Sequence, residues 1–230
     1  MSEDTWTGIR ERVLRLAEHP GAGQVFGARG HGFRLGPVMR QEELLSLEAA
    51  LGSELPAPYR GFLLRVGSGG AGPHYGLMTP VASDGGWRWT GVGLAFPAQS
   101  TPAEFAGQPF VAPALQDELD TLDAEEPEKD AFADEEAFRH AYTAWVARYD
   151  ELCDAQEAGT VFLSEQGCGY ASLLVTTGPH RGTVWDDLRP MDRGIEPTGY
   201  DFAHWYLSWL ERTEQQLALT SSASTPPPGT

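Results

Sequence analysis

Carboxylates are the side chains of this sequence that are best placed to do chemistry. Asp186 and Asp187 are adjacent, as are Glu125 and Glu126, and a carboxyl pair acts as general acid and base when burial raises the pKa of one member. The chain, however, holds 33 Asp and Glu residues among 230, so adjacent pairs arise from composition alone. We therefore interpret these pairs as solvated surface rather than as a glycosidase-like site.

Nucleophile and metal motifs give no positive signal. There is no G-x-S-x-G segment, and Cys168 stands between two glycines with no histidine near it in sequence. No two histidines are spaced as H-x-x-x-H or H-E-x-x-H, the spacing of metal ligands on one helix. We expect no metal and no cofactor, and we expect Cys153 and Cys168 to be reduced structural thiols. His74 is the histidine we would substitute first, because it follows a glycine-rich turn.

The segment 67–72 formally satisfies G-x-G-x-x-G. A dinucleotide site requires that this motif leave a strand and enter a helix, so that the pyrophosphate meets the helix N-terminus. Here a predicted helix precedes the motif and a predicted strand follows it. We interpret the glycines as a helix-ending turn, and a small-molecule enzyme is the least favoured class of function.

The negative net charge of the chain restricts the kinds of molecule that it can bind. The formal charge of −17 argues against nucleic acid as a primary ligand, because affinity for phosphates depends on cationic side chains. No apolar run approaches the length that crosses a bilayer, and the acidic N-terminus does not look like a secretory signal. The sequence therefore predicts a soluble, cytoplasmic protein with no membrane partner.

The negative charge is concentrated in residues 117–136, which contain eleven acidic residues and one lysine and so carry ten of the seventeen net charges. Such a run is commonly a solvated or flexible face. Dense negative charge also speeds association with a cationic partner. We hypothesise that this acidic block, together with Asp186 and Asp187, binds a basic protein; its candidate residues are Asp117, Glu118, Asp120, Asp123, Glu125 and Glu126.

Most aromatic residues lie at helical spacing and are predicted to form the core. These are Tyr59, Phe62, Trp145, Trp205 and Trp209. Trp87 and Trp89 differ, because they lie in a short predicted strand beside a glycine turn, on one face of it. We expect these two tryptophans to be exposed hot spots for a partner.

Hydrophobic periodicity predicts the elements that position these residues. Helices are predicted from about residue 6 to 19, over 41–51, around 59–66, over 138–152 and from 201 onward; strands are predicted at 31–35, 75–81, 87–89, 160–164, 170–177 and 182–186. Helices first, strands late and a closing helix indicate an α+β fold with an antiparallel or mixed sheet covered by helices. We predict one domain over 1–219, with a long acidic insertion in an excursion at about 82–158, and a disordered tail over 220–230.

Several weak elements occur in an order that resembles the SUKH superfamily, which is named after a yeast regulator of cell-wall synthesis and has many bacterial members. They are the helix 42–51 with Gly52, Leu55-Pro56, Tyr59, Phe62-Leu63, Gly69-Gly70 and 75–77, then Phe162-Leu163, 167–169, 171–175, 182–185 and 202–210. The resemblance covers roughly residues 30–212, and the acidic block has no counterpart in it.

The resemblance implies a single α+β domain without catalytic activity. In bacteria it implies an immunity protein, which binds and occludes a cognate toxin domain deployed between competing cells. A nuclease toxin would suit an acidic protein, because nucleases are typically basic. The alternative is an intracellular scaffold or regulatory protein of the same family, without a toxin partner.

Overall fold

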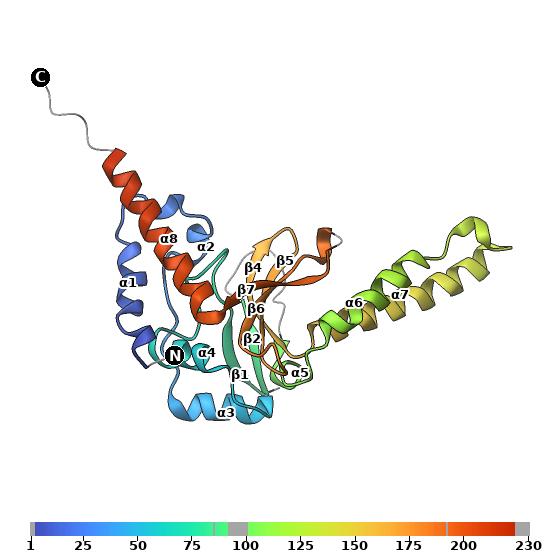
Figure 1. The fold of residues 1–230 in the computed structure, drawn as a ribbon, viewed down its shortest axis with the longest axis horizontal. Coiled ribbons are helices and arrows are strands. Elements are labelled where there is room, and N and C mark those ends of the chain that lie inside the picture. The colour runs from blue at the N-terminus through green and yellow to red at the C-terminus, as the bar shows by residue number, and fades with distance from the viewer. Residues whose placement is uncertain (1–2, 85, 92–100, 192, 224–230) are drawn as a thin grey trace, which may run out of the picture.

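A four-stranded sheet from the last third of the chain lies at the centre of the computed structural model, which describes residues 3–84, 86–91, 101–191 and 193–223 (Figure 1). Its strands are β4 (Thr160–Gly167), β5 (Tyr170–Val175), β6 (Thr183–Asp187) and β7 (Ile195–Asp201). They pair in chain order, and every pair is antiparallel. The three predicted strands of this region are confirmed. β7 was not predicted, because Pro197 and Gly199 make its sequence look like a turn.

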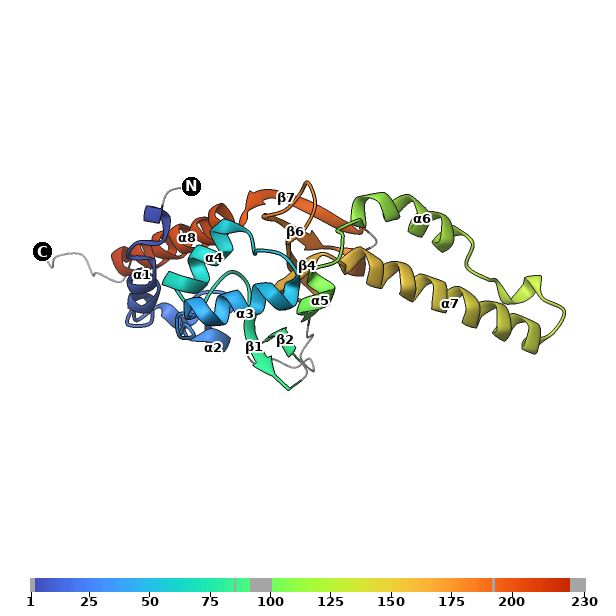
Figure 2. The same ribbon diagram turned by 90° about the horizontal axis from the view of Figure 1, so that it is seen from below.

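Helices from the two ends of the chain cover one face of this sheet (Figures 1 and 2). They are α1 (Ile9–Leu16), α2 (Ala28–His31), α3 (Gln41–Leu51), α4 (Ala57–Arg65) and α8 (Phe202–Ala223), with 3-10 turns at Glu3–Trp6 and Ala22–Gln24. Gly52 ends α3 with a φ of +77°, as predicted. Asp201 caps α8 by accepting a hydrogen bond from the His204 amide at 2.8 Å, also as predicted.

The main core lies between these helices and the sheet. Phe62 of α4 packs against Phe202 and Tyr206 of α8, with ring centroids 5.5 and 4.8 Å apart. The Tyr206 hydroxyl donates to the Ala71 carbonyl at 2.9 Å, which ties α8 to the glycine-rich turn. Burying these rings removes a large apolar area from water and supplies most of the stability of this part of the fold.

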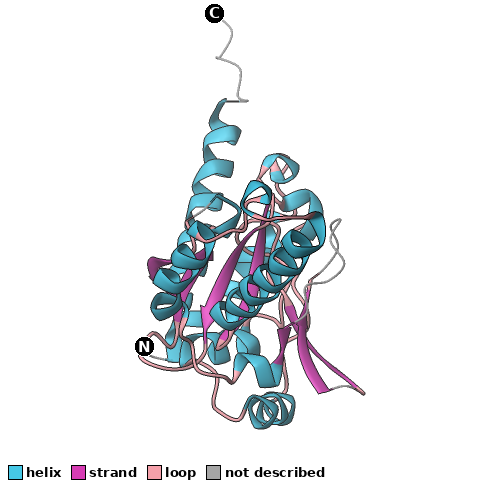
Figure 3. Ribbon diagram, turned by 90° about the vertical axis from the view of Figure 1, so that its right-hand side faces the viewer, coloured by secondary structure: helices cyan, strands magenta, loops and turns pink. Residues whose placement is uncertain are grey.

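A second, three-stranded sheet extends to one side of the body (Figure 3). It contains β1 (Thr79–Ser83), β2 (Gly86–Thr90) and β3 (Thr101–Pro102), and the short helix α5 (Ala103–Ala106) follows. The predicted strand at 87–89 is confirmed, whereas that at 75–81 begins later, at Thr79. The predicted strand at 31–35 is wrong, since residue 31 ends α2 and Leu35 makes one isolated bridge to Gly70.

A pair of long helices projects from the opposite side of the sheet, away from α8 (Figures 1 and 2). They are α6 (Ala112–Ala124) and α7 (Glu135–Glu157), with a 3-10 turn at Lys129–Ala131 between them. We call residues 112–157 the arm. The excursion predicted at 82–158 is therefore two parts, because β1, β2 and α5 belong to the body and only the arm extends from it.

The C-terminal helix is longer than the sequence predicted. Helix α8 continues to Ala223, so the predicted disordered tail does not begin at residue 220. Residues 224–230 of that tail lie outside the described residues. Within the described part of the chain, no helix combines the length and apolar character needed to cross a membrane. The α+β class is confirmed by the helices and the two antiparallel sheets.

Candidate functional site: an acidic arm

Local sequence signals explain both helices of the arm. Asp134 caps α7, since its carboxylate accepts from the Ala137 amide at 2.8 Å, and Glu135 and Glu136 favour the positive end of the helix dipole. Pro113 stands in the first turn of α6, where a missing amide proton costs nothing. Helix α6 was not predicted from the sequence, because Pro109 and Pro113 make this segment look like a surface loop. The apolar spacing of Leu115, Leu119 and Leu122 was the signal that could have found it.

A row of aromatic rings runs along α7 and joins it to α6. Successive ring centroids are 5.6, 5.7 and 5.3 Å apart in the aromatic row, which comprises Phe138, Tyr142, Trp145 and Tyr149. Phe132, from the connection between the helices, adds a ring 5.8 Å from Phe138. The Trp145 indole donates to the Leu122 carbonyl at 2.7 Å. Trp145 therefore packs in the arm, and its predicted place in the core is wrong.

The arm has little interior of its own. Along α7 the buried residues are Leu152 and Gln156, and along α6 they are Ala112 and Leu119. Three of these four lie toward the ends of the helices that join the body, so that the outer part of the arm rests on Leu119 and the aromatic row. Tyr142 keeps 37% of its surface exposed.

The six acidic candidates of the sequence analysis gather on this arm. Asp117, Glu118, Asp120, Asp123, Glu125 and Glu126 are all exposed, on α6 or directly after it. Glu118 pairs with Arg148 of α7, which also pairs with Glu151 at 2.7 Å. Across residues 112–157 there are fifteen acidic and three Lys or Arg residues. Twelve of the seventeen net negative charges are therefore on the arm.

Asp187 does not extend this acidic surface, which corrects the sequence-based expectation. It is buried, and its carboxylate accepts from Arg189 Nε at 2.9 Å and Nη2 at 2.6 Å. Arg189 also pairs with Glu157 and donates to the Cys153 carbonyl at 3.1 Å. Burial alone would lower the pKa of Arg189, but the hydrogen bonds and charges of Asp187 and Glu157 outweigh it and raise that pKa. The network is an anchor between β6 and the base of α7.

Asp186 is likewise engaged within the fold. Its Oδ1 accepts from Gln166 Nε2 at 2.7 Å and from Ser172 Oγ at 2.9 Å, which places it on the sheet rather than on the arm. Of the two adjacent carboxylates, Asp187 is neutralised by Arg189 and Asp186 is half-buried. The sheet surface around them offers far less free negative charge than the arm does.

The two tryptophans predicted as exposed hot spots are held by the body. Trp89 is fully buried, and its indole donates to the Tyr59 hydroxyl at 2.8 Å, so its predicted exposure is wrong. Burial also raises the pKa of Tyr59. Trp87 is half-buried and donates to Ser46 Oγ at 3.0 Å. Both point the same way on β2, as predicted, but that face packs on α3 and α4 instead of facing solvent.

The glycine-rich turn 67–72 and Cys168 were also considered for chemistry. The glycines of 67–72 follow α4, and a Cβ at Gly70 would lie 2.4 Å from the Arg34 carbonyl oxygen, so this turn requires glycine there. Cys168 is exposed in the β4–β5 turn with a φ of +54°. Among the described residues, no group of His, Cys, Asp and Glu could hold a metal ion.

His31 is a buried titratable group that the sequence analysis did not single out. Its ring lies between Phe33 and Trp209, and Nδ1 accepts from the Phe33 amide at 3.0 Å. Burial, with a smaller contribution from the charge of Arg34, lowers the pKa of His31 to about 4. His74, whose pKa is also lowered by burial, is half-buried in the loop before β1.

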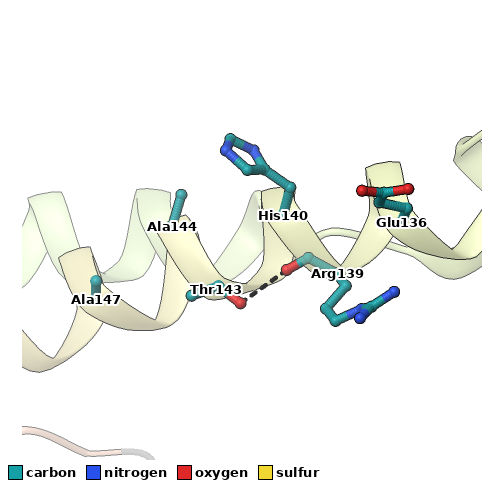
Figure 4. A pocket seen from close by; sticks show the side chains of 6 residues that line it. All are labelled: Glu136, Arg139, His140, Thr143, Ala144 and Ala147. Carbon is teal, nitrogen blue, oxygen red and sulfur yellow. Dashed lines mark hydrogen bonds between the residues drawn. The ribbon is translucent and has the colours of Figure 1, made fainter.

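A shallow hollow lies along the surface of α7 (Figure 4). Its lining residues are Glu136, Arg139, His140, Thr143, Ala144 and Ala147. The Thr143 hydroxyl donates a hydrogen bond to the Arg139 carbonyl of the same helix at 2.8 Å. Because one helix supplies the whole lining, the hollow does not enclose a small molecule.

Comparisons of the chain with models of protein families, with curated proteins and with solved structures found no match. The resemblance to the SUKH superfamily therefore stays a prediction from the sequence. The arm, with its exposed carboxylates and partly covered aromatic row, is the candidate site that the structure itself provides.

Proposed function

We propose that this protein is a non-catalytic binding domain that captures a basic protein partner with its arm. The observation that carries the proposal is that most of the net negative charge lies on the arm and not on the body. Twelve of seventeen net negative charges lie on a helical pair that projects from the body, and the six candidate carboxylates, on α6 or directly after it, are exposed.

Electrostatics explain why such an arm would suit a cationic partner. Clustered charge of one sign creates a potential that raises the rate of association with the opposite sign by orders of magnitude, and the effect weakens with ionic strength. The same charge repels nucleic acid. A projecting helical pair also presents its carboxylates on several sides, so that a partner can approach without contacting the sheet.

The resemblance to the SUKH superfamily supplies the biological setting of the proposal. In that setting the protein is a cytoplasmic immunity protein of bacteria, and its partner is a toxin domain, of the basic nuclease type, deployed between competing cells. Inhibition would be by occlusion: the bound domain loses access to its anionic substrate, and no bond is made or broken by this chain.

Survival of a host cell tests the proposal. The C-terminal domain of the larger gene product encoded next to this protein is expressed with and without it, and survivors are counted. We expect toxicity that this protein relieves, and co-purification that weakens as salt rises. Toxicity without rescue would contradict the immunity role and favour the scaffold or regulatory alternative.

A charge-matched pair of variants makes the same experiment specific for the arm. The arm variant carries Asp117→Asn, Asp120→Asn, Asp123→Asn, Glu125→Gln and Glu126→Gln; the body variant carries Glu11→Gln, Glu18→Gln, Glu54→Gln, Asp84→Asn and Glu211→Gln, all at exposed positions. Both lose five negative charges. We expect rescue to fail for the arm variant alone; equal rescue by both would show that the arm is not the binding site.

A further inference from the structure

The arm is a pair of helices whose aromatic row is only partly covered. A helix that packs on a single neighbour covers a narrow seam of its surface, and large apolar side chains beside that seam stay exposed unless a further helix packs on them. In the body, by contrast, Tyr59, Phe62 and Tyr206 are each at most 1% exposed. The aromatic row remains partly exposed over its whole length, which leaves an apolar surface that no described part of the chain covers.

The uncovered surface is a narrow stripe along one side of α7. Tyr142, Val146 and Tyr149 recur at i, i+4 and i+7, so they share a face, and each is incompletely buried. From Tyr142 to Tyr149 the stripe rises by seven residue steps, which is about 10 Å or two helical turns. An apolar stripe of this length and spacing matches the contact face of a second helix, since helices pack by laying such stripes together.

Carboxylates border the stripe on both sides. Asp123 of α6 lies near Tyr149, where its charge, after burial, helps to raise the pKa of the tyrosine hydroxyl. Asp150 is exposed on α7 one turn beyond Val146. An apolar stripe between two acidic margins is complementary to a helix that has apolar residues on one face and Lys or Arg on its flanks.

We propose that the stripe of Tyr142, Val146 and Tyr149 binds a cationic amphipathic helix of the partner, which completes the arm as a three-helix bundle. This inference rests on the proposed function and specifies which element of the basic partner is recognised. A second copy of this chain is a poorer occupant, because two arms would each bring twelve net negative charges to one interface.

Two synthetic peptides test this on the full-length protein. One, of about 18 residues, contains Lys and Leu with Leu at i, i+3, i+4 and i+7; the other has the same composition in an order that gives no apolar face. Affinity is measured at about 0.15 M salt, and peptide helicity is followed by circular dichroism. We expect the amphipathic peptide to bind about tenfold more tightly and to become helical on binding.

The outcomes separate this inference from the proposed function. Equal affinity of the two peptides, with both remaining unstructured, would overturn the three-helix inference and leave capture by charge intact. Failure of both peptides to bind would contradict the electrostatic capture as well. Stronger self-association than peptide binding, seen by sedimentation and lost in Tyr142→Ala, would identify a second copy as the occupant and overturn the inference.

Variants locate the binding surface. We expect Tyr142→Ala with Val146→Ala to weaken binding of the amphipathic peptide about five- to tenfold and to leave the scrambled peptide unaffected, while Tyr142→Phe keeps the affinity. Phe26→Ala is the matched control, because Phe26 is an aromatic residue of the body that is 60% exposed. An equal loss in the control, or none in the double variant, would contradict the assignment.

Discussion

The body and the arm of this protein both contain clustered aromatic residues, but they differ in how far these residues are buried. Both are built around aromatic side chains, but in the body Phe62 and Tyr206 are fully buried between helices and sheet, whereas Tyr142 on the arm is 37% exposed. The body holds most of the cationic side chains, and the arm carries most of the net charge. The fold therefore encloses the aromatic side chains of the body, whereas the arm leaves part of its aromatic row and most of its carboxylates in solvent. This contrast is the basis of the binding role that we propose for the arm.

The largest expected difference in stability is between removing an aromatic ring from the body and removing one from the arm. Phe62→Ala should lower the free energy of unfolding by about 3–5 kcal/mol, because it leaves a cavity in a packed core. Trp145→Ala should cost about 1 kcal/mol, because its ring is already half-exposed. Urea unfolding midpoints measure both. Equal losses would mean that the arm and the body form one cooperative core, contrary to the distinction drawn between them.

Arg189 at the base of the arm and Arg148 on the arm each pair with two carboxylates, so the losses of stability on substituting them can be compared. Arg189→Met should destabilise the protein by about 3 kcal/mol, because it leaves the buried Asp187 without a counter-charge. Arg148→Met is the matched change on the arm, and it should cost less than about 0.5 kcal/mol, because its pairs with Glu118 and Glu151 are exposed to water.

Hydrogen exchange provides the second readout for the anchor. In Arg189→Met, amides near Leu152 and Gln156 should exchange faster, since these residues lie where α7 joins the sheet. Unchanged exchange there, or a similar loss of stability in both arginine variants, would show that Arg189 does not anchor the arm.

Lowering the pH should lower the free energy of unfolding because of His31, which lies in the body. In the folded state its pKa is about 4, against 6.5 for the ordinary group, so between these values the unfolded chain binds a proton that the folded protein does not. The contribution is complete above pH 6.5 and is lost as the pH falls toward 4, by up to about 3 kcal/mol. In His31→Gln this part of the pH dependence should vanish.

The unchanged protein is the control for His31→Gln, and the free energy of unfolding of both is measured against pH. Curves of equal slope for His31→Gln and the unchanged protein between about pH 6.5 and 4 would refute the assignment of this titration to His31.

Neutralising the arm should have the smallest effect on stability. The five arm substitutions from carboxylate to amide should change the free energy of unfolding by less than about 1 kcal/mol, because solvated charges contribute little to folding. Relief of repulsion among neighbouring carboxylates makes a small gain the expected direction. A large loss, measured by urea unfolding, would show that these carboxylates have a structural role.

Local patterns account for what the sequence predicted well. Helices α3, α4 and α8 have apolar spacing with clear end signals such as Gly52 and Asp201, and β4, β5 and β6 are rich in β-forming residues. These features depend on neighbours in sequence, so no tertiary information was needed. The six acidic candidates on α6 and directly after it were predicted as exposed for the same reason, since clustered charge has to be solvated.

Tertiary contacts explain the failures. Trp89 sits beside a glycine turn, yet the Tyr59 hydroxyl thirty residues earlier accepts its indole proton inside the core. Asp187 appeared to be one of a surface pair, but Arg189, which neutralises it, also pairs with Glu157 of α7, 32 residues earlier in the sequence, at the junction of sheet and arm. Partners so distant in sequence leave no local signal, which is why burial of a particular side chain was harder to predict than the element that holds it.

The salt dependence of binding tests the central claim most directly. The proposed toxin partner, expressed as an isolated domain, is titrated with the unchanged protein, the arm variant and the body variant over a range of salt concentration, and the logarithm of Kd is plotted against that of salt. We predict a steep slope for the unchanged protein and the body variant, and a weaker affinity with a shallower slope for the arm variant. Identical affinities and slopes for all three would contradict capture by the arm.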